Sequence, residues 1–90
     1  MEVSLDPGKR AWTLLERGVD FADAETLWDR PTLTLVDDRF DYPEQRYQTY
    51  GWIGERMAMM AWTPTENGIR VISMRYRHGK EQRRIAPRMG

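Results

Sequence analysis

A run of basic side chains follows an apolar segment near the C-terminus, within GIRVISMRYRHGKEQRR at residues 68–84. The segment contains six cations and only one acid, Glu81, and one histidine, His78. The cations are Arg70, Arg75, Arg77, Lys80, Arg83 and Arg84. Arginine binds phosphate oxygens through a planar fork of N–H donors. Such groups can stabilise the negative charge that develops when a ribose 2′-hydroxyl attacks the adjacent phosphate, a reaction confined to RNA. The composition of this segment therefore permits RNA cleavage.

An alternating pattern places these cations at the end of a strand. The two predicted faces are Ile69, Val71, Ser73 and Arg75 on one side and Arg70, Ile72, Met74 and Tyr76 on the other. The apolar middle anchors the strand in the core, and its C-terminal end carries Arg75, Tyr76 and Arg77 to a surface. We therefore expect these cations to be held rigidly, as a phosphate site requires.

Other kinds of active site find little support in the sequence. The chain has no cysteine and one histidine, so it has no thiolate nucleophile and no ligand set typical of zinc. It also lacks a glycine-rich phosphate loop and a nucleophile elbow. His78 has a side chain suited to proton transfer near neutral pH, or it is simply exposed. We expect no cofactor and no metal.

The net charge of zero hides an asymmetry along the chain. Residues 1–69 carry seven Lys/Arg against thirteen Asp/Glu, a net of −6, and residues 70–90 carry seven against one, a net of +6. This asymmetry indicates a basic patch that meets a polyanion. Alternatively, the basic tail forms a solvated ion-pair face with Asp20, Asp23 and Glu25, in which each pair contributes about 0–1 kcal/mol.

The elements that position these residues follow from caps and hydrophobic spacing. Asp6-Pro7 and Gly18 bound a first predicted helix with Ala11, Trp12, Leu14 and Leu15 on its apolar stripe. Asp20 and Pro31 bound a second, whose inner face is Phe21, Ala24, Leu27 and Trp28. Trp12 and Trp28 could stack on nucleic-acid bases, but core packing is the favoured interpretation because both lie on apolar stripes.

After Pro31 the pattern predicts strands and a short basic helix. The predicted strands cover 32–36, 45–51, 56–62 and 69–77, with a hairpin turn at Asn67-Gly68 and a final helix from Gly79 that Pro87 ends. We expect an α+β fold in which two N-terminal helices pack on an antiparallel sheet of about four strands. No apolar run approaches about 18 residues and the N-terminus lacks a secretory signal. We therefore expect one cytoplasmic domain over residues 1–90, without a membrane segment.

Together these motifs resemble the BrnT family of type II toxin–antitoxin toxins. The pieces that carry the resemblance, in order, are DPGK at 6–9, RGVDFADA at 17–24, PEQRY at 43–47 with Gly51, and RVISMR at 70–75 followed by Glu81 in a basic helix. They span most of the chain, from Asp6 to Arg84. The resemblance implies a RelE-like fold and a ribonuclease that cuts mRNA and halts growth. It also implies a BrnA-like antitoxin partner, a heterotetramer built on an antitoxin dimer, and contact with DNA only through the antitoxin.

The resemblance also assigns site residues by position. The family-typical places are Lys9, Arg46, Arg70, Arg75 and Glu81. We expect Arg75 and Arg46 to contact the scissile phosphate, Lys9 to lie nearby and Glu81 to orient an arginine. The residues expected to bind RNA are Arg77, His78, Lys80, Arg83 and Arg84.

The chain departs from the family pattern at several positions. Family members commonly have Asn where Thr13 lies and a Lys-His pair at Glu16-Arg17, and an aromatic residue often lies where this chain has Ile85. Arg77 and His78 replace small residues before the last helix. These departures favour a second hypothesis, a catalytically inactive module that binds RNA or the antitoxin.

Overall fold

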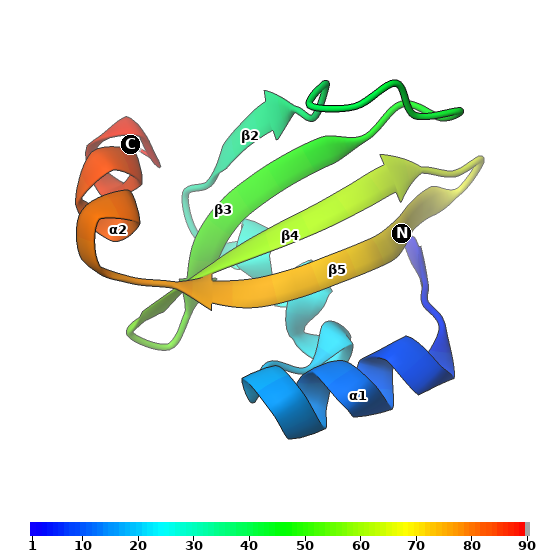
Figure 1. Ribbon diagram of the computed structural model, residues 1–90, viewed down its shortest axis with the longest axis horizontal. Coiled ribbons are helices and arrows are strands. Elements are labelled where there is room, and N and C mark those ends of the chain that lie inside the picture. Colours follow the sequence, from blue (N-terminus) through cyan, green and yellow to red (C-terminus); the bar gives the residue numbers. More distant parts are fainter. Residues whose placement is uncertain (90) are drawn as a thin grey trace.

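The computed structural model describes residues 1–89 as a five-stranded sheet with helices on both faces and beside one edge (Figure 1). The strand order is β1-β5-β4-β3-β2. Its strands are β1 (Glu2–Ser4), β2 (Leu33–Val36), β3 (Tyr47–Ile53), β4 (Arg56–Pro64) and β5 (Gly68–Arg77). Its helices are α1 (Pro7–Arg17), the 3₁₀ helix η1 (Phe21–Asp29), α2 (Gly79–Ile85) and the 3₁₀ helix η2 (Ala86–Met89). The predicted mixed α+β class is confirmed, and its details need correction.

The first helix begins and ends where its capping residues predicted. Asp6 Oδ1 accepts hydrogen bonds from the backbone N–H of Gly8 and Lys9 at 2.8 and 3.3 Å. Gly18 ends α1 in the left-handed region, at φ 71°. The predicted apolar stripe is wrong, however, because Leu15 is 82% exposed and Trp12 52%, whereas Thr13 is buried at 3%. The helix lies beside β5 at the edge of the sheet (Figure 1), so it buries only a narrow side.

The second predicted helix is a 3₁₀ helix. Asp20 caps η1 by accepting from the backbone N–H of Ala22 at 2.9 Å. The residues buried beneath η1 are Phe21, Ala24 and Leu27. They recur every third residue, which is the period that aligns side chains on a 3₁₀ helix. Trp28 remains 37% exposed and sets its ring edge-on against Trp62, with centroids 5.6 Å apart.

One strand was not predicted. β1 pairs in parallel with the start of β5, with Val3 opposite Ile69, so the sheet is not wholly antiparallel. A Cβ on Gly68 would lie 1.9 Å from the backbone oxygen of Glu2, so this pairing requires glycine. The three residues of β1 are too few to show an alternating pattern, which is why the sequence did not reveal them.

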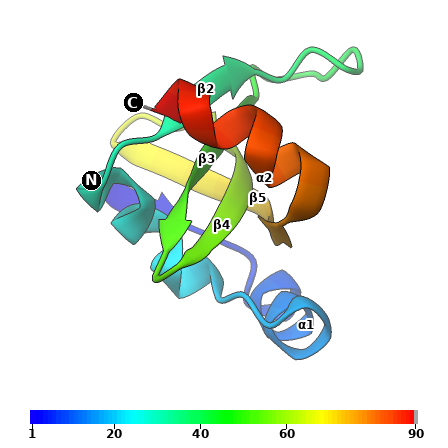
Figure 2. The same ribbon diagram turned by 90° about the vertical axis from the view of Figure 1, so that its left-hand side faces the viewer.

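The central strand β4 is buried on both faces and so divides the core in two. Ala58 and Met60 pack with η1, and Met57 and Met59 pack with Ile85 of α2 on the other face. Figure 2 shows α2 on the side of the sheet opposite α1. The last helix ends before Pro87, as predicted, but η2 follows it and buries Met89. We call the side of the sheet covered by α2 and η2 the α2 face.

A bulge in β5 decides which way its arginines point. Ala61 pairs with Ser73 but Trp62 pairs with Val71, so Ile72 is an extra residue on β5. Arg75 therefore lies opposite Met59 and Arg77 opposite Met57, and directly paired residues share a face. The predicted strict alternation, which put Arg75 on the face of Ile69 and Val71, is wrong. Arg75 points to the α2 face instead.

Within residues 1–89, no helix has the length and apolar character needed to span a membrane.

Candidate active site

Three arginines from three parts of the chain lie around a fourth, Arg75. They form the arginine cluster, which consists of Arg17 at the end of α1, Arg39 in the β2–β3 loop, and Arg75 and Arg77 on β5. The pKa of Arg75 is lowered from its ordinary value, first by burial and then by the charges of Arg17, Arg77 and Arg39. Its side chain nevertheless remains exposed. Concentrated positive charge that an incoming group can reach favours the binding of an anion such as phosphate.

Arg17 ties α1 to the unpaired part of β5. Its Nη1 donates to the backbone oxygen of Met74 at 3.2 Å, and its guanidinium lies 5.1 Å from the centroid of the Trp12 ring. Pairing with β1 extends only to Arg70, so β5 has no strand neighbour on this side beyond that residue. Arg17 therefore satisfies one carbonyl of that edge and brings a cation to the side of Arg75.

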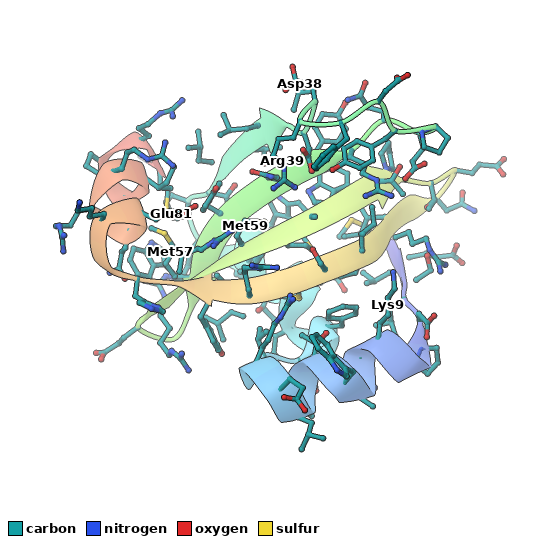
Figure 3. The ribbon with its side chains drawn as sticks, viewed as in Figure 1. Lys9, Asp38, Arg39, Met57, Met59 and Glu81 are labelled. Carbon is teal, nitrogen blue, oxygen red and sulfur yellow. The ribbon has the colours of Figure 1, made fainter. Side chains whose placement is uncertain are left out.

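Arg39 is held in place by a buried carboxylate. Its Nε and Nη2 donate to the two carboxylate oxygens of Asp37 at 2.8 and 2.9 Å. With its amide oxygen turned toward Arg39, Gln48 accepts from the same two nitrogens at 3.2 and 3.1 Å. The hydrogen bonds from Arg39 lower the pKa of Asp37. Figure 3 shows Arg39 reaching from the loop over β3. Although it lies in a loop, this arginine is fixed in orientation.

Glu81 provides a carboxylate at the margin of the cluster (Figure 3). It accepts a hydrogen bond from the Tyr50 hydroxyl at 3.0 Å, and its Oε1 lies 3.5 Å from Arg77 Nε. The N–H of Arg77 Nε is buried and has no hydrogen-bond acceptor among residues 1–89, because Glu81 is close enough for an ion pair but not aligned to accept. Burial and the bond to Glu81 raise the pKa of Tyr50, so its hydroxyl is protonated at neutral pH.

The structure brings together some of the predicted site residues. Arg75, Arg77 and Glu81 lie on the α2 face, where Glu81 forms an ion pair with Arg77. Lys9 lies on α1, two turns before Arg17, and both residues line a groove between α1 and β5. Arg70 lies five residues before Arg75, about 17 Å away along an extended strand, and pairs with Ser4 and Thr63.

Arg46 lies in different surroundings. Its Nε donates to Glu44 at 2.6 Å and its guanidinium stacks on the Tyr42 ring at 4.0 Å. Both partners belong to the β2–β3 loop, whose pocket is also lined by Asp38 and Asp41. A pocket rich in carboxylates disfavours an anion. The predicted contact of Arg46 with the scissile phosphate therefore has no support from its neighbours.

The predicted RNA-binding residues of the last helix are not members of the arginine cluster. His78 is the N-cap residue of α2, and its exposed side chain makes no capping hydrogen bond. Lys80, Arg83 and Arg84 are exposed on α2. They extend the basic surface beyond Glu81, and Arg84 is near enough to Tyr50 to oppose the rise of its pKa.

Sequence reasoning missed Arg39, Tyr50 and the place of Arg17 in the cluster. Arg17 had a signal, because Lys9, Thr13 and Arg17 are four residues apart and so share one side of a helix. Tyr50 had a weaker signal, namely its position in the alternating pattern of its strand. Arg39 had none, since a loop residue has no periodicity to place it.

Three further findings concern metal binding and similarity to known proteins. Within residues 1–89, no group of three or more acidic or histidine side chains could hold a metal ion. A family model described as the ribonuclease toxin BrnT of type II toxin–antitoxin systems matches residues 5–81. No curated protein matches the chain at a significant level.

Proposed function

The chain belongs to the BrnT family of ribonuclease toxins of type II toxin–antitoxin systems, and we propose that it is a metal-independent endoribonuclease that cleaves mRNA and arrests growth. The arginine cluster is the observation that carries this proposal. Three other guanidinium groups act on Arg75, which is exposed and carries a lowered pKa. A bound phosphate relieves their mutual repulsion, and more so when the phosphate gains negative charge during reaction.

The proposed reaction is transfer of the phosphate within the RNA strand. The ribose 2′-oxygen forms a bond to phosphorus, and the bond from phosphorus to the 5′-oxygen of the next nucleotide breaks. Arg75 and Arg77 neutralise the non-bridging oxygens. The products are a 2′,3′-cyclic phosphate and a free 5′-hydroxyl.

Proton transfer in this proposal belongs to Glu81 and Tyr50. The Glu81 carboxylate accepts the proton of the 2′-hydroxyl, and the Tyr50 hydroxyl gives its own proton to the departing 5′-oxygen. Their hydrogen bond of 3.0 Å then returns the proton from Glu81 to Tyr50. General acid–base groups of this kind contribute roughly 10²–10⁴-fold in rate.

Replacement of Arg75 tests the proposal in cells. Induced wild-type protein should arrest growth and fragment mRNA, whereas Arg75→Ala should do neither, because loss of one charge-stabilising donor costs on the order of 10²–10³ in rate. Arg88→Ala is the matched control, since it removes an exposed arginine from η2, outside the cluster. Circular dichroism of the purified variants verifies folding. Full toxicity of a folded Arg75→Ala protein would refute the role of the cluster.

A second candidate function is a binding module without catalytic activity. Arg17 lies where the family commonly has a histidine and is bound to Met74 and Trp12, which favours this alternative. Such a module should bind RNA saturably, weaken steeply with salt and yield no cleavage products. Incubation of purified protein with labelled RNA distinguishes the two functions by the presence or absence of products.

Membership of a type II toxin–antitoxin family implies an antitoxin partner. We propose that this partner is BrnA-like, that an antitoxin dimer carries a toxin at each end, and that the toxin meets DNA only through it. Light scattering of the co-expressed complex tests the stoichiometry. A mass of two toxins and two antitoxins is expected, and one of each would contradict it.

A further inference from the structure

A groove runs between α1 and the unpaired edge of β5. It encloses about 310 Å³. Its lining includes Lys9, Trp12, Thr13 and Arg17 from α1, and Ile72 and Ser73 from β5. The groove exists because β1 stops pairing at Arg70, which leaves α1 as the neighbour of the rest of β5.

The groove adjoins the arginine cluster. Arg17 lines the groove and also lowers the pKa of Arg75 through its charge. Ser73 lines the groove two residues before Arg75 on the same strand. An RNA strand with one phosphate at Arg75 therefore has a groove beside it that could take the next nucleotide.

The side chains of the groove suit a nucleotide. Trp12 is 52% exposed and its ring already stacks with the guanidinium of Arg17 at 5.1 Å. Lys9 and Arg17 lie eight residues apart on α1, about 12 Å along its axis, and no acid is among the described residues that line the groove. Cations beside an exposed aromatic ring are how proteins hold single-stranded nucleic acid. A separate hollow lined by Trp28 and Trp62 also contains Glu25 and Asp29, whose negative charge disfavours RNA there.

We propose that this groove is a subsite for an RNA nucleotide adjoining the scissile phosphate, with its base stacked on Trp12, the phosphate on the side of the arginine cluster contacted by Arg17 and the next phosphate along the strand held by Lys9. The proposal rests on the proposed ribonuclease function and deepens it. The Trp12 subsite extends the contact with RNA beyond the reacting phosphate, so it affects the affinity for longer substrates.

Binding of an RNA that cannot be cleaved tests the subsite. The probe is a fluorescein-labelled hexanucleotide with 2′-O-methyl groups at every position, followed by fluorescence anisotropy with the full chain. Trp12→Ala should weaken binding about five- to tenfold, because stacking of a base on an aromatic side chain is worth that much at an exposed site. Trp12→Phe should restore most of it. Leu15→Ala is the matched control, since Leu15 is 82% exposed on the same helix and absent from the groove lining, and it should bind within twofold of wild type.

Lys9→Ala provides a second readout, because loss of one phosphate contact should reduce the slope of log affinity against log salt by about 0.7.

Wild-type affinity for a folded Trp12→Ala protein would overturn the subsite. So would a Trp12→Ala protein that binds RNA normally but no longer binds purified antitoxin, which would make the groove a protein interface. Cleavage of the unmethylated hexanucleotide is scored separately. A wild-type chain that binds but does not cut would defeat the ribonuclease proposal and leave the subsite standing.

Discussion

The site depends on individual interactions that keep Arg75 close to three other arginines. Arg75 is placed by the strand, Arg17 by its bond to Met74 and Arg39 by buried Asp37. Arg75 was predicted for the site from the basic segment and from the family resemblance, and Glu81 from the family resemblance by position. The sequence did not predict Arg39, because contact between a loop and a strand face depends on the folded chain.

Asp37 should make stability depend on pH. Arg39 lowers the pKa of this carboxyl below its ordinary 3.8. A lowered pKa in the folded state adds stability above the ordinary pKa, and this stability is lost as pH falls through the lowered value. Asp37→Asn should therefore reduce the free energy of unfolding by about 1 kcal/mol at neutral pH, with a difference from wild type that shrinks below about pH 4.

Urea unfolding across the pH range measures this difference. Asp38→Asn serves as the control, because Asp38 is an exposed neighbour in the same loop. A gap between wild type and Asp37→Asn that stays constant down to low pH would show that the charge of Asp37 does not stabilise the fold.

At the scale of elements, capping residues predicted helix bounds correctly, whereas features that depend on pairing between distant strands were not predicted. The caps at Asp6 and Gly18 predicted the bounds of α1 because capping acts within a few residues. The bulge at Ile72 and the pairing of β1 depend on partner strands, so the sequence did not reveal them. The prediction that the apolar residues of α1 are buried was wrong because this helix lies beside the sheet, where few of its side chains are covered. The RelE-like fold that the family resemblance implies stays a prediction.

Gly68→Ala should disrupt the pairing of β1 with β5. The added methyl group cannot fit 1.9 Å from the backbone oxygen of Glu2, so β1 must shift or detach. We expect a loss of about 1–3 kcal/mol in the free energy of unfolding, measured by urea denaturation. In a chain that starts at Leu5, the same substitution should cost much less, because the clashing strand is absent. Equal costs in both backgrounds would disprove the explanation.

At the scale of the whole molecule, the sheet separates two cores and leaves its cationic end open. η1 covers one face, and α2 with η2 covers part of the other, next to which the arginine cluster lies. The sequence divides into an acidic N-terminal part and a basic C-terminal part, but the ion pairs in the folded chain do not follow this division. Arg10 pairs with Asp20 and Arg39 with Asp37, so acids of the N-terminal part are neutralised by nearby arginines rather than by the basic tail. The cations of β5 and α2 are therefore not neutralised by these N-terminal acids.

Cleavage of a defined RNA in the presence of EDTA is the measurement that tests this function most directly. Purified wild-type protein should cut the RNA and leave a 2′,3′-cyclic phosphate with a 5′-hydroxyl, and a single 2′-deoxy substitution at the cut position should abolish the reaction. Arg75→Ala should cut at least about 100-fold more slowly. Products that carry a 5′-phosphate, or activity that disappears with EDTA, would contradict a metal-independent attack by the 2′-hydroxyl at the arginine cluster.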